Sequence, residues 1–220
     1  MELYNQAETI RNSAINYRRF LTTTFVALLR GVNVGSANRL AMAALQAAFA
    51  DADGGNVETL LQSGNVVFDA PADEGEAIAE RARASIARAA DIDATIVLRD
   101  GDGWRKLVAG NPFLAASADV DAPHAACLSV APSHERLARL EPDRSPPDAF
   151  VVVGADVYLR LPNGAARSKL TNAWLDARLD VVSTMRNWRT VTKLAAMVEA
   201  RWRLAAFTAA RRGGLSRNRG

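Results

Sequence analysis

Residues 57–68 read Val-Glu-Thr-Leu-Leu-Gln-Ser-Gly-Asn-Val-Val-Phe, and this stretch decides the fold. Two short apolar runs, 57–61 and 66–68, flank the tetrad Gln62-Ser63-Gly64-Asn65. Glycine and asparagine tolerate the left-handed backbone that a tight reversal needs, so the tetrad predicts a turn between two strands. The stretch therefore predicts a β-hairpin.

The segments on both sides of the hairpin predict two further strands and two helices. The β-branched and aliphatic run 23–29 predicts a strand, and 40–49 predicts a helix. The Ala-rich run 73–90 places acidic residues in its first turns and arginines later, which is the order that suits a helix dipole. A strand over 94–98 completes the order β-α-β-β-α-β, the split ferredoxin-like arrangement.

The second half of the chain repeats this theme less regularly. Its patterns predict strands over 125–130, 150–153, 157–161 and 181–185, and helices over 102–109, 133–140, 168–179 and 190–207. No low-complexity linker separates the halves, so we expect an α+β fold of two ferredoxin-like βαββαβ subdomains packed as one unit. The predicted divisions are a polar N-terminal extension (1–22), the subdomains 23–100 and 101–207, and a basic flexible tail (208–220). We expect residues 1–20 and 208–220 to be dispensable for folding.

Composition excludes several classes of protein. The chain has 220 residues, of which 49% are hydrophobic, enough to bury a substantial core. Neither a run of about 20 apolar residues nor a secretory signal is present, so we expect a cytoplasmic protein without a membrane partner. The single cysteine, Cys127, lies in a predicted strand, and we interpret it as a core thiol rather than a nucleophile.

The charge is distributed very unevenly along the chain. Residues 51–156 hold nine Lys and Arg against 19 Asp and Glu, whereas residues 157–220 hold 13 against three. Without its two ends, the segment 23–200 holds 18 basic and 22 acidic residues, which is a net charge of −4. The pI of about 9.4 therefore does not indicate a globally basic nucleic-acid binder, and only a local basic stretch over 160–193 remains.

Five motifs occur in the order found in a known bacterial family. They are ALLRGVNVG at 27–35, LQSGNVVF at 61–68, NPF at 111–113, RSKLTN at 167–172 and TMRNWRTVTKL at 184–194. Over roughly residues 23–198 the chain resembles the uncharacterised family called domain of unknown function 1697. The resemblance implies two ferredoxin-like subdomains and no known activity. Leu60, Ala37 and Ala41 stand where Tyr, Lys and Pro are usual, and Ala37 weakens any proposal that a lysine of this loop holds a phosphate.

No residues identify a metal site, a cofactor or a reaction. The two histidines, His124 and His134, fall in different predicted elements, and one cysteine cannot complete a zinc set. Gly-x-Ser-x-Gly is absent, so a serine hydrolase is not indicated. We expect no metal and no cofactor, and no catalytic residue can be named.

Two loops allow both a functional and a purely structural interpretation. Residues 30–35 (RGVNVG), followed by Asn38, have the strand-to-helix setting of a phosphate-binding turn, but they lack the third glycine of a dinucleotide fingerprint. Alternatively, Gly31 and Gly35 supply positive φ while an asparagine caps the helix. The tetrad 62–65 is either only a turn or a set of hydrogen-bonding groups for a ligand.

The two basic motifs of the second half are equally ambiguous. Residues 164–171 (GAARSKLT) depart from a P-loop at the glycine and the hydroxyl, and they suggest a helix start capped by Ser168, with or without an anion bound beside it. Residues 184–190 (TMRNWRT) combine Trp188 with two arginines. Such a set stacks against a base, binds a phosphate or anchors a protein partner, unless Trp188 packs between the sheet and the helix as a core residue. Under either interpretation, Asn187 or Thr190 is expected to cap the last helix.

We expect the polar loop residues to form one concave, locally positive surface. The predicted function is a binding module for an anionic ligand, either an anionic small molecule such as a nucleotide or a nucleic acid. The alternative is an enzyme acting on a small phosphorylated or carboxylated substrate. The predicted ligand-binding residues are Arg30, Asn33, Gln62, Asn65, Arg167, Lys169, Arg186, Asn187 and Trp188.

Overall fold

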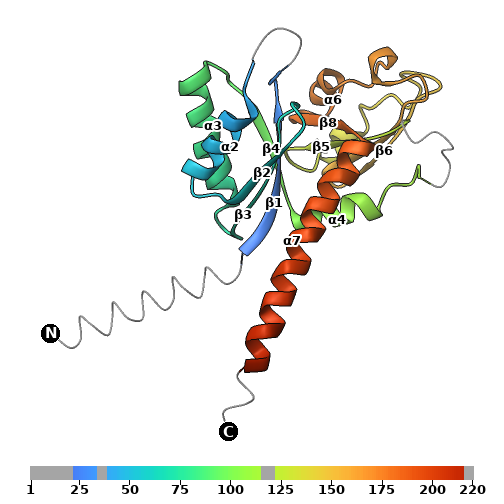
Figure 1. The fold of residues 1–220 in the computed structure, drawn as a ribbon. Coiled ribbons are helices and arrows are strands. Elements are labelled where there is room, and N and C mark those ends of the chain that lie inside the picture. Colours follow the sequence, from blue (N-terminus) through green and yellow to red (C-terminus); the bar gives the residue numbers. More distant parts are fainter. Residues whose placement is uncertain (1–21, 34–38, 115–121, 216–220) are drawn as a thin grey trace.

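The computed structural model describes residues 22–33, 39–114 and 122–215, which form two mixed α and β units side by side (Figure 1). The predicted extension 1–22, apart from Thr22, lies outside the described residues, as do Gly35, Ala37 and Asn38 of the first loop.

The first unit is a four-stranded antiparallel sheet with two helices on one face. Its strands pair in the order β2-β3-β1-β4. The elements are β1 (Thr22–Arg30), α2 (Met42–Asp51), β2 (Gly55–Leu60), β3 (Asn65–Pro71), α3 (Gly75–Ala90) and β4 (Thr95–Asp100). This order is that of a βαββαβ unit in which the first and third strands are central, as the hairpin at 57–68 predicts.

The second unit repeats the same topology. Its strands pair in the order β6-β7-β5-β8, again antiparallel throughout. The elements are β5 (Pro123–Leu128), α5 (His134–Leu137), β6 (Ala149–Val153), β7 (Asp156–Arg160), the 3-10 turn η1 (Ala165–Arg167), α6 (Asn172–Leu179) and β8 (Ser183–Asn187). The predicted α+β fold with two ferredoxin-like subdomains is therefore confirmed.

Two helices outside these repeats join the units. They are α4 (Gly101–Ala109), which connects the units along the chain, and α7 (Trp188–Leu215), which follows the last strand. Trp104 of α4 and Trp188 of α7 are buried between the sheets with side chains of β1 and β5. The alternation along β1 explains this middle layer, because Val26 and Leu28 face it while Phe25 packs under α2 and α3.

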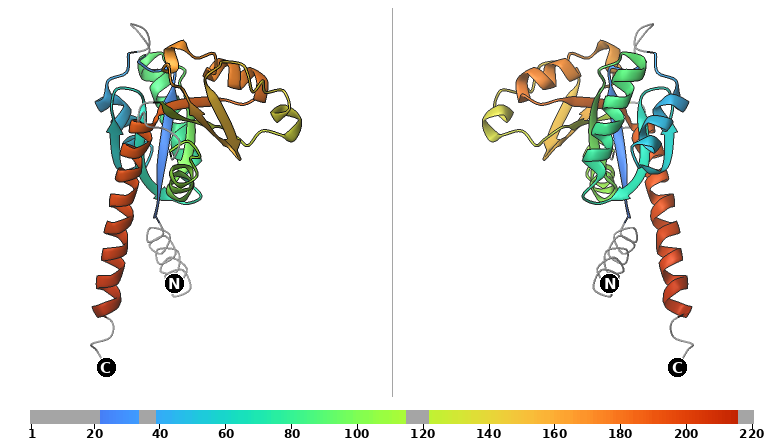
Figure 2. Two further views of the ribbon diagram at one scale, coloured as in Figure 1. Left: turned by 90° about the vertical axis from the view of Figure 1, so that its right-hand side faces the viewer. Right: turned by 90° about the vertical axis from the view of Figure 1, so that its left-hand side faces the viewer.

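Helix α7 begins earlier and ends later than the periodicity over 190–207 predicts. Its first turn starts directly after β8, because the Asn187 side chain accepts a hydrogen bond from the Thr190 N–H at 2.8 Å and caps the helix. The helix extends past the body of the protein to Leu215 (Figures 1 and 2). Within the described residues, no helix is long and apolar enough to span a bilayer.

The predicted start of α6 at Ser168 is wrong. The Ser168 hydroxyl instead accepts from the Leu170 N–H two residues later, in a local turn that sends the Leu170 side chain into the core. Thr171 is the actual cap, since its hydroxyl accepts from the Trp174 N–H at 3.2 Å.

Candidate functional site

Two adjoining hollows lie beside the loop that follows β1, and the first of them lies where the first unit meets the second. One, of about 540 Å³, is bounded by the end of β1, the β2–β3 turn and strand β8. The other, of about 450 Å³, lies at the start of α2. They share Asn33 and Gln62, and we call the two together the junction hollow. The lining residues outside this shared pair are Leu29, Arg30, Gly31, Val32, Leu61, Ser63, Asn172, Thr184 and Arg186 in the first hollow and Arg39, Leu40, Ala41 and Met42 in the second.

Asn33 organises the loop that follows β1. It has a φ of 53°, which asparagine tolerates better than most residues. Its side-chain carbonyl accepts from the Leu40 N–H at 2.8 Å, and its amide donates to the Leu40 carbonyl at 3.0 Å and to the Gln62 carbonyl at 2.8 Å. The Asn33 side chain thus links the segment before α2 to the β2–β3 turn. Both its carbonyl and its amide group are used in hydrogen bonds within the protein.

Gly64 allows the β2–β3 turn to lie against the end of β1. Its φ is +70°, and a Cβ atom there would come within 2.6 Å of Val32 Cγ2 and 2.8 Å of Leu29 Cβ. The close approach lets the Gly64 carbonyl accept from the Leu29 N–H at 2.7 Å. The turn therefore forms one wall of the junction hollow because this residue has no side chain.

Arg186 connects the second unit to the first from inside this wall. Its Nε donates to Asn65 Oδ1 at 2.6 Å, and its Nη2 donates to the carbonyls of Leu29 at 2.8 Å and Ser63 at 3.0 Å. Nη1 donates within β8, to Thr184 Oγ1 and to the Met185 carbonyl. All five N–H groups of the guanidinium are thus engaged.

The charge of Arg186 is not neutralised by a neighbouring acid. Every acceptor around the guanidinium is a neutral oxygen, and no carboxylate pairs with it among the residues that the structure describes. Burial lowers the pKa of the Arg186 guanidinium to about 10, well above neutral pH, so the group remains cationic. A half-buried positive charge therefore lies in the wall of the hollow.

Arg30 has a different role, because a carboxylate compensates it. Its guanidinium forms an ion pair with Asp176 of α6 and donates to the Ser183 carbonyl at 3.2 Å. Asp176 in turn accepts from the Ser183 N–H at 2.8 Å and from the Ser183 hydroxyl at 2.7 Å. Arg30 thus forms a second link between the units and adds little net charge to the hollow.

Further donors around the hollow remain open to a ligand. Arg39 is exposed and has no hydrogen-bond or ion-pair partner among the described residues, and it lies three residues before Met42, where α2 begins. Among the residues that the structure describes, none caps the N-terminus of α2 with its side chain, and the first turn holds no acidic residue, so its first N–H groups are open to a ligand. The exposed Gln62 side chain adds an amide. Arg39 is not among the residues predicted from the sequence, although its position directly before the predicted helix 40–49 was a usable signal.

The nine predicted site residues do not all come together. Arg30, Asn33, Gln62 and Arg186 line the junction hollow, and Asn65 lies behind Arg186 as its acceptor. Arg167 and Lys169 lie in and after η1, outside the lining of either hollow. Asn187 caps α7, and Trp188, which is 8% exposed, packs in the middle core layer.

The groups most often used in catalysis lie elsewhere. Cys127 is fully enclosed, and burial raises the pKa of its thiol to about 12, which suppresses the reactive thiolate. His124 is buried, with its Nδ1 3.1 Å from the Ala122 carbonyl. Among the described residues, no three His, Cys, Asp or Glu side chains gather as metal ligands. Neither Cys127 nor either histidine lines the junction hollow.

Comparisons with known proteins identify the relatives of this chain. The family model described as Protein of unknown function (DUF1697) matches residues 22–158. Among solved structures, the chain is similar to the conserved bacterial protein SP0830 from Streptococcus pneumoniae, with a TM-score of 0.63 and 18% identity, over 80% of this chain and 99% of that one. At this identity the similarity shows the fold alone. No curated protein matches the chain.

Proposed function

We propose that this chain, which belongs to the DUF1697 family of unknown function, binds an anionic, phosphate-bearing ligand in the junction hollow. The ligand would be a nucleotide or a nucleic acid. The observation that carries this proposal is the half-buried guanidinium of Arg186, which lines the hollow without a carboxylate partner among the described residues. An ion of opposite charge in the hollow would relieve that imbalance, and a low-dielectric wall strengthens the attraction.

The charges around the hollow add up in favour of an anion. Arg30, Arg39 and Arg186 contribute +3 and Asp176 contributes −1, which leaves a local charge of +2. Arg186 acts through its field, since its N–H groups are occupied. The direct contacts would come from Arg39, from the Gln62 amide and from the first N–H groups of α2, a common arrangement for phosphate oxygens.

The size of the hollow is compatible with a nucleotide. Small-molecule sites usually measure about 300 to 1,000 Å³, and the two parts of the hollow measure about 540 and 450 Å³. An enzyme acting on a small phosphorylated or carboxylated substrate stays an alternative prediction. It is the less favoured of the two, since no described group in the hollow is placed as a nucleophile.

A titration with two probes tests the proposal. Fluorescence anisotropy would follow a labelled single-stranded DNA of about twelve nucleotides, and ADP would be added as a competitor. Arg39→Ala is expected to weaken binding about tenfold, because one charge-assisted hydrogen bond contributes about 1.5 kcal/mol. Lys106→Ala removes an equally exposed cation from α4 and should leave the affinity unchanged.

The salt dependence of the titration distinguishes the ligand classes. A nucleic acid would lose affinity steeply as salt rises, because bound phosphates release counterions. Displacement of the DNA by ADP would instead indicate a nucleotide pocket. The proposal fails if neither probe binds, or if Arg39→Ala and Lys106→Ala weaken binding equally.

A further inference from the structure

Strand β6 forms an open edge of the second sheet. The order β6-β7-β5-β8 places β6 at one end, and no described residue pairs with the side of β6 that faces away from β7. In an antiparallel pair, alternate residues direct their N–H and C=O groups away from the partner strand, so β6 presents a row of open backbone groups. The strand at the other end is β8, which lines the junction hollow. The open edge is therefore separated from the proposed anion site by the width of the sheet.

The side chains of β6 suit pairing with another strand. Residues 149–153 read Ala-Phe-Val-Val-Val, without a charge or a proline, and their pairing with β7 runs without a bulge. Val151 and Val153 project from one face and are 39% and 55% exposed. Phe150 and Val152 project from the other face, where they are half-buried against the core of the second unit. A further strand beside β6 would therefore bury apolar surface on both faces of the sheet.

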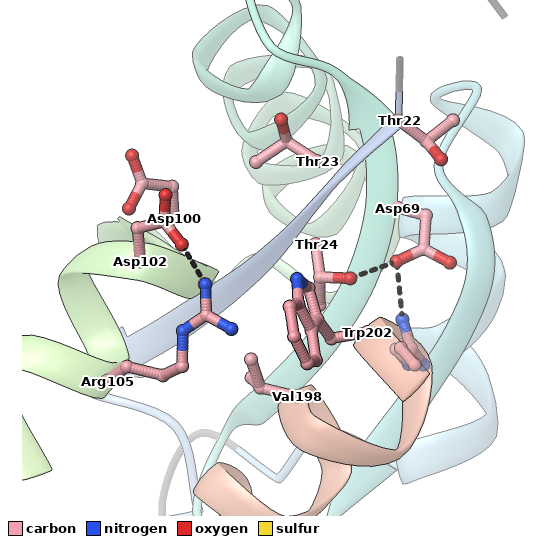
Figure 3. A pocket seen from close by; sticks show the side chains of 11 residues that line it. Thr22, Thr23, Thr24, Asp69, Asp100, Asp102, Arg105, Val198 and Trp202 are labelled. Atoms are coloured by element: carbon pink, nitrogen blue, oxygen red, sulfur yellow. Dashed lines mark hydrogen bonds and ion pairs between the residues drawn. The ribbon is translucent and has the colours of Figure 1, made fainter. Parts of the chain in front are cut away.

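The terminal strands β2, β4 and β8 are protected in ways that β6 is not. The pairing of β2 is interrupted by a register shift, and its Glu58 forms an ion pair with Arg201 of α7 at 2.7 Å. The same helix brings Trp202 into the pocket beside β1 and β3 (Figure 3). Arg99 of β4 and Arg186 of β8 each donate hydrogen bonds across to the other unit. Bulges, charges and covering elements are the usual protection of sheet edges, and β6 has none of them among the described residues.

We propose that β6 pairs with β6 of a second copy of this chain, antiparallel and about a two-fold axis, so that the two sheets join into one. The register of this pair follows from the backbone. Residues that direct their N–H and C=O groups outward must face one another, so the possible registers differ by steps of two residues. The register that pairs the whole strand places Val151 opposite Val151 of the second copy, Phe150 opposite Val152, and Ala149 opposite Val153.

The complementarity of β6 to itself favours a second copy over a strand of another protein. Every pair in this register joins two apolar side chains, and Phe150 opposite Val152 is an aromatic and β-branched combination, which is favourable across strands. A two-fold arrangement also uses the open edges of both copies at once, so the assembly closes as a dimer. The inference is independent of the anion proposal, because the two β8 strands that line the junction hollows lie at opposite ends of the joined sheet.

Charged substitutions at the two-fold axis test both the occupant and the register. In analytical ultracentrifugation at tens of micromolar, we expect the natural chain to sediment with twice the 23.6 kDa mass of one chain. Val151→Lys and Val151→Glu each place like charges opposite one another, so each variant alone should be monomeric. An equimolar mixture of the two should recover the doubled mass, because the charges then attract. Val130→Lys changes a valine that is 59% exposed outside β6 and should leave the dimer intact.

Disulfide cross-linking keeps the test informative if a charged variant misfolds. Val151→Cys would face its counterpart within the span of a disulfide, so mild oxidation should give a covalent dimer. Val153→Cys is more exposed but would lie more than about 13 Å from its counterpart, four positions along the strand, and should not cross-link. The natural Cys127 is buried and should stay reduced. Two results would overturn the proposal: a natural chain that is monomeric, or a dimer that Val151→Cys does not cross-link.

Discussion

Replacing Arg186 by Ala is predicted to destabilise the fold by about 3 kcal/mol. Three of its hydrogen bonds cross between the units, to Asn65, Leu29 and Ser63. Hydrogen bonds from a charged donor contribute about 1.5 to 3 kcal/mol each, which sets an upper range of about 4.5 to 9 kcal/mol. Removing the side chain also removes the cost of burying a cation, and water from the hollow can reach the freed carbonyls, so the net loss is expected below that range, at about 3 kcal/mol.

Urea denaturation followed by circular dichroism measures this loss. For a chain of this size, about 3 kcal/mol corresponds to a fall in melting temperature of roughly 6 to 12 °C. Arg186→Lys keeps the charge but cannot reproduce the fork of five donors, so it should lose stability while retaining part of the anion affinity. Arg88→Ala, at the exposed end of α3, is the control and should change the stability by less than about 0.5 kcal/mol. A loss below about 1 kcal/mol for Arg186→Ala would refute the reasoning.

Three further predictions concern the turn, the buried thiol and the helix cap. Gly64→Ala should destabilise the chain by about 3 kcal/mol, because its Cβ would meet Val32 and Leu29 at under 3.0 Å. Gly154 also has a positive φ, but a Cβ atom there would meet no atom within 4 Å. Gly154→Ala should therefore lower the free energy of unfolding by only about 1 kcal/mol in the same urea assay. Burial raises the pKa of the Cys127 thiol and of the Tyr158 phenol to about 12. The folded chain therefore keeps protons that the unfolded chain loses, and the free energy of unfolding should fall as pH rises above about 9, less steeply in Cys127→Ala. A slope unchanged by that substitution would contradict the thiol's contribution. Asn187→Ala should cost about 1 kcal/mol by removing the cap of α7, and equal melting curves for both chains would contradict it.

Local patterns were sufficient to predict the fold. The turn tetrad 62–65 and the alternation along 23–29 depend on neighbours in sequence, and the paired sheets place them as the βαββαβ order predicts. The ends of helices were less predictable where a side chain can either cap the helix or close a local turn. Ser168 suits a helix cap, yet it forms a turn instead because burying Leu170 requires the chain to bend first.

The candidate site was only partly predictable, because its decisive contacts are long-range. The motif 184–190 marks Arg186 as notable, but its acceptors Leu29 and Ser63 lie 157 and 123 residues away along the chain. The same motif contains Trp188, whose burial depends on the second sheet and on α4. No local pattern distinguishes an arginine that links two units from one that faces solvent, nor a stacking tryptophan from a core tryptophan.

Hydrogen exchange with and without ligand tests the central claim most directly, since it locates the binding site on the chain. Saturating ADP or the single-stranded DNA is predicted to slow amide exchange in residues 29–33, 39–46 and 60–65, which surround the junction hollow. Protection confined to α7 or to the second unit, or no protection with either probe, would contradict the claim that the junction hollow binds an anion.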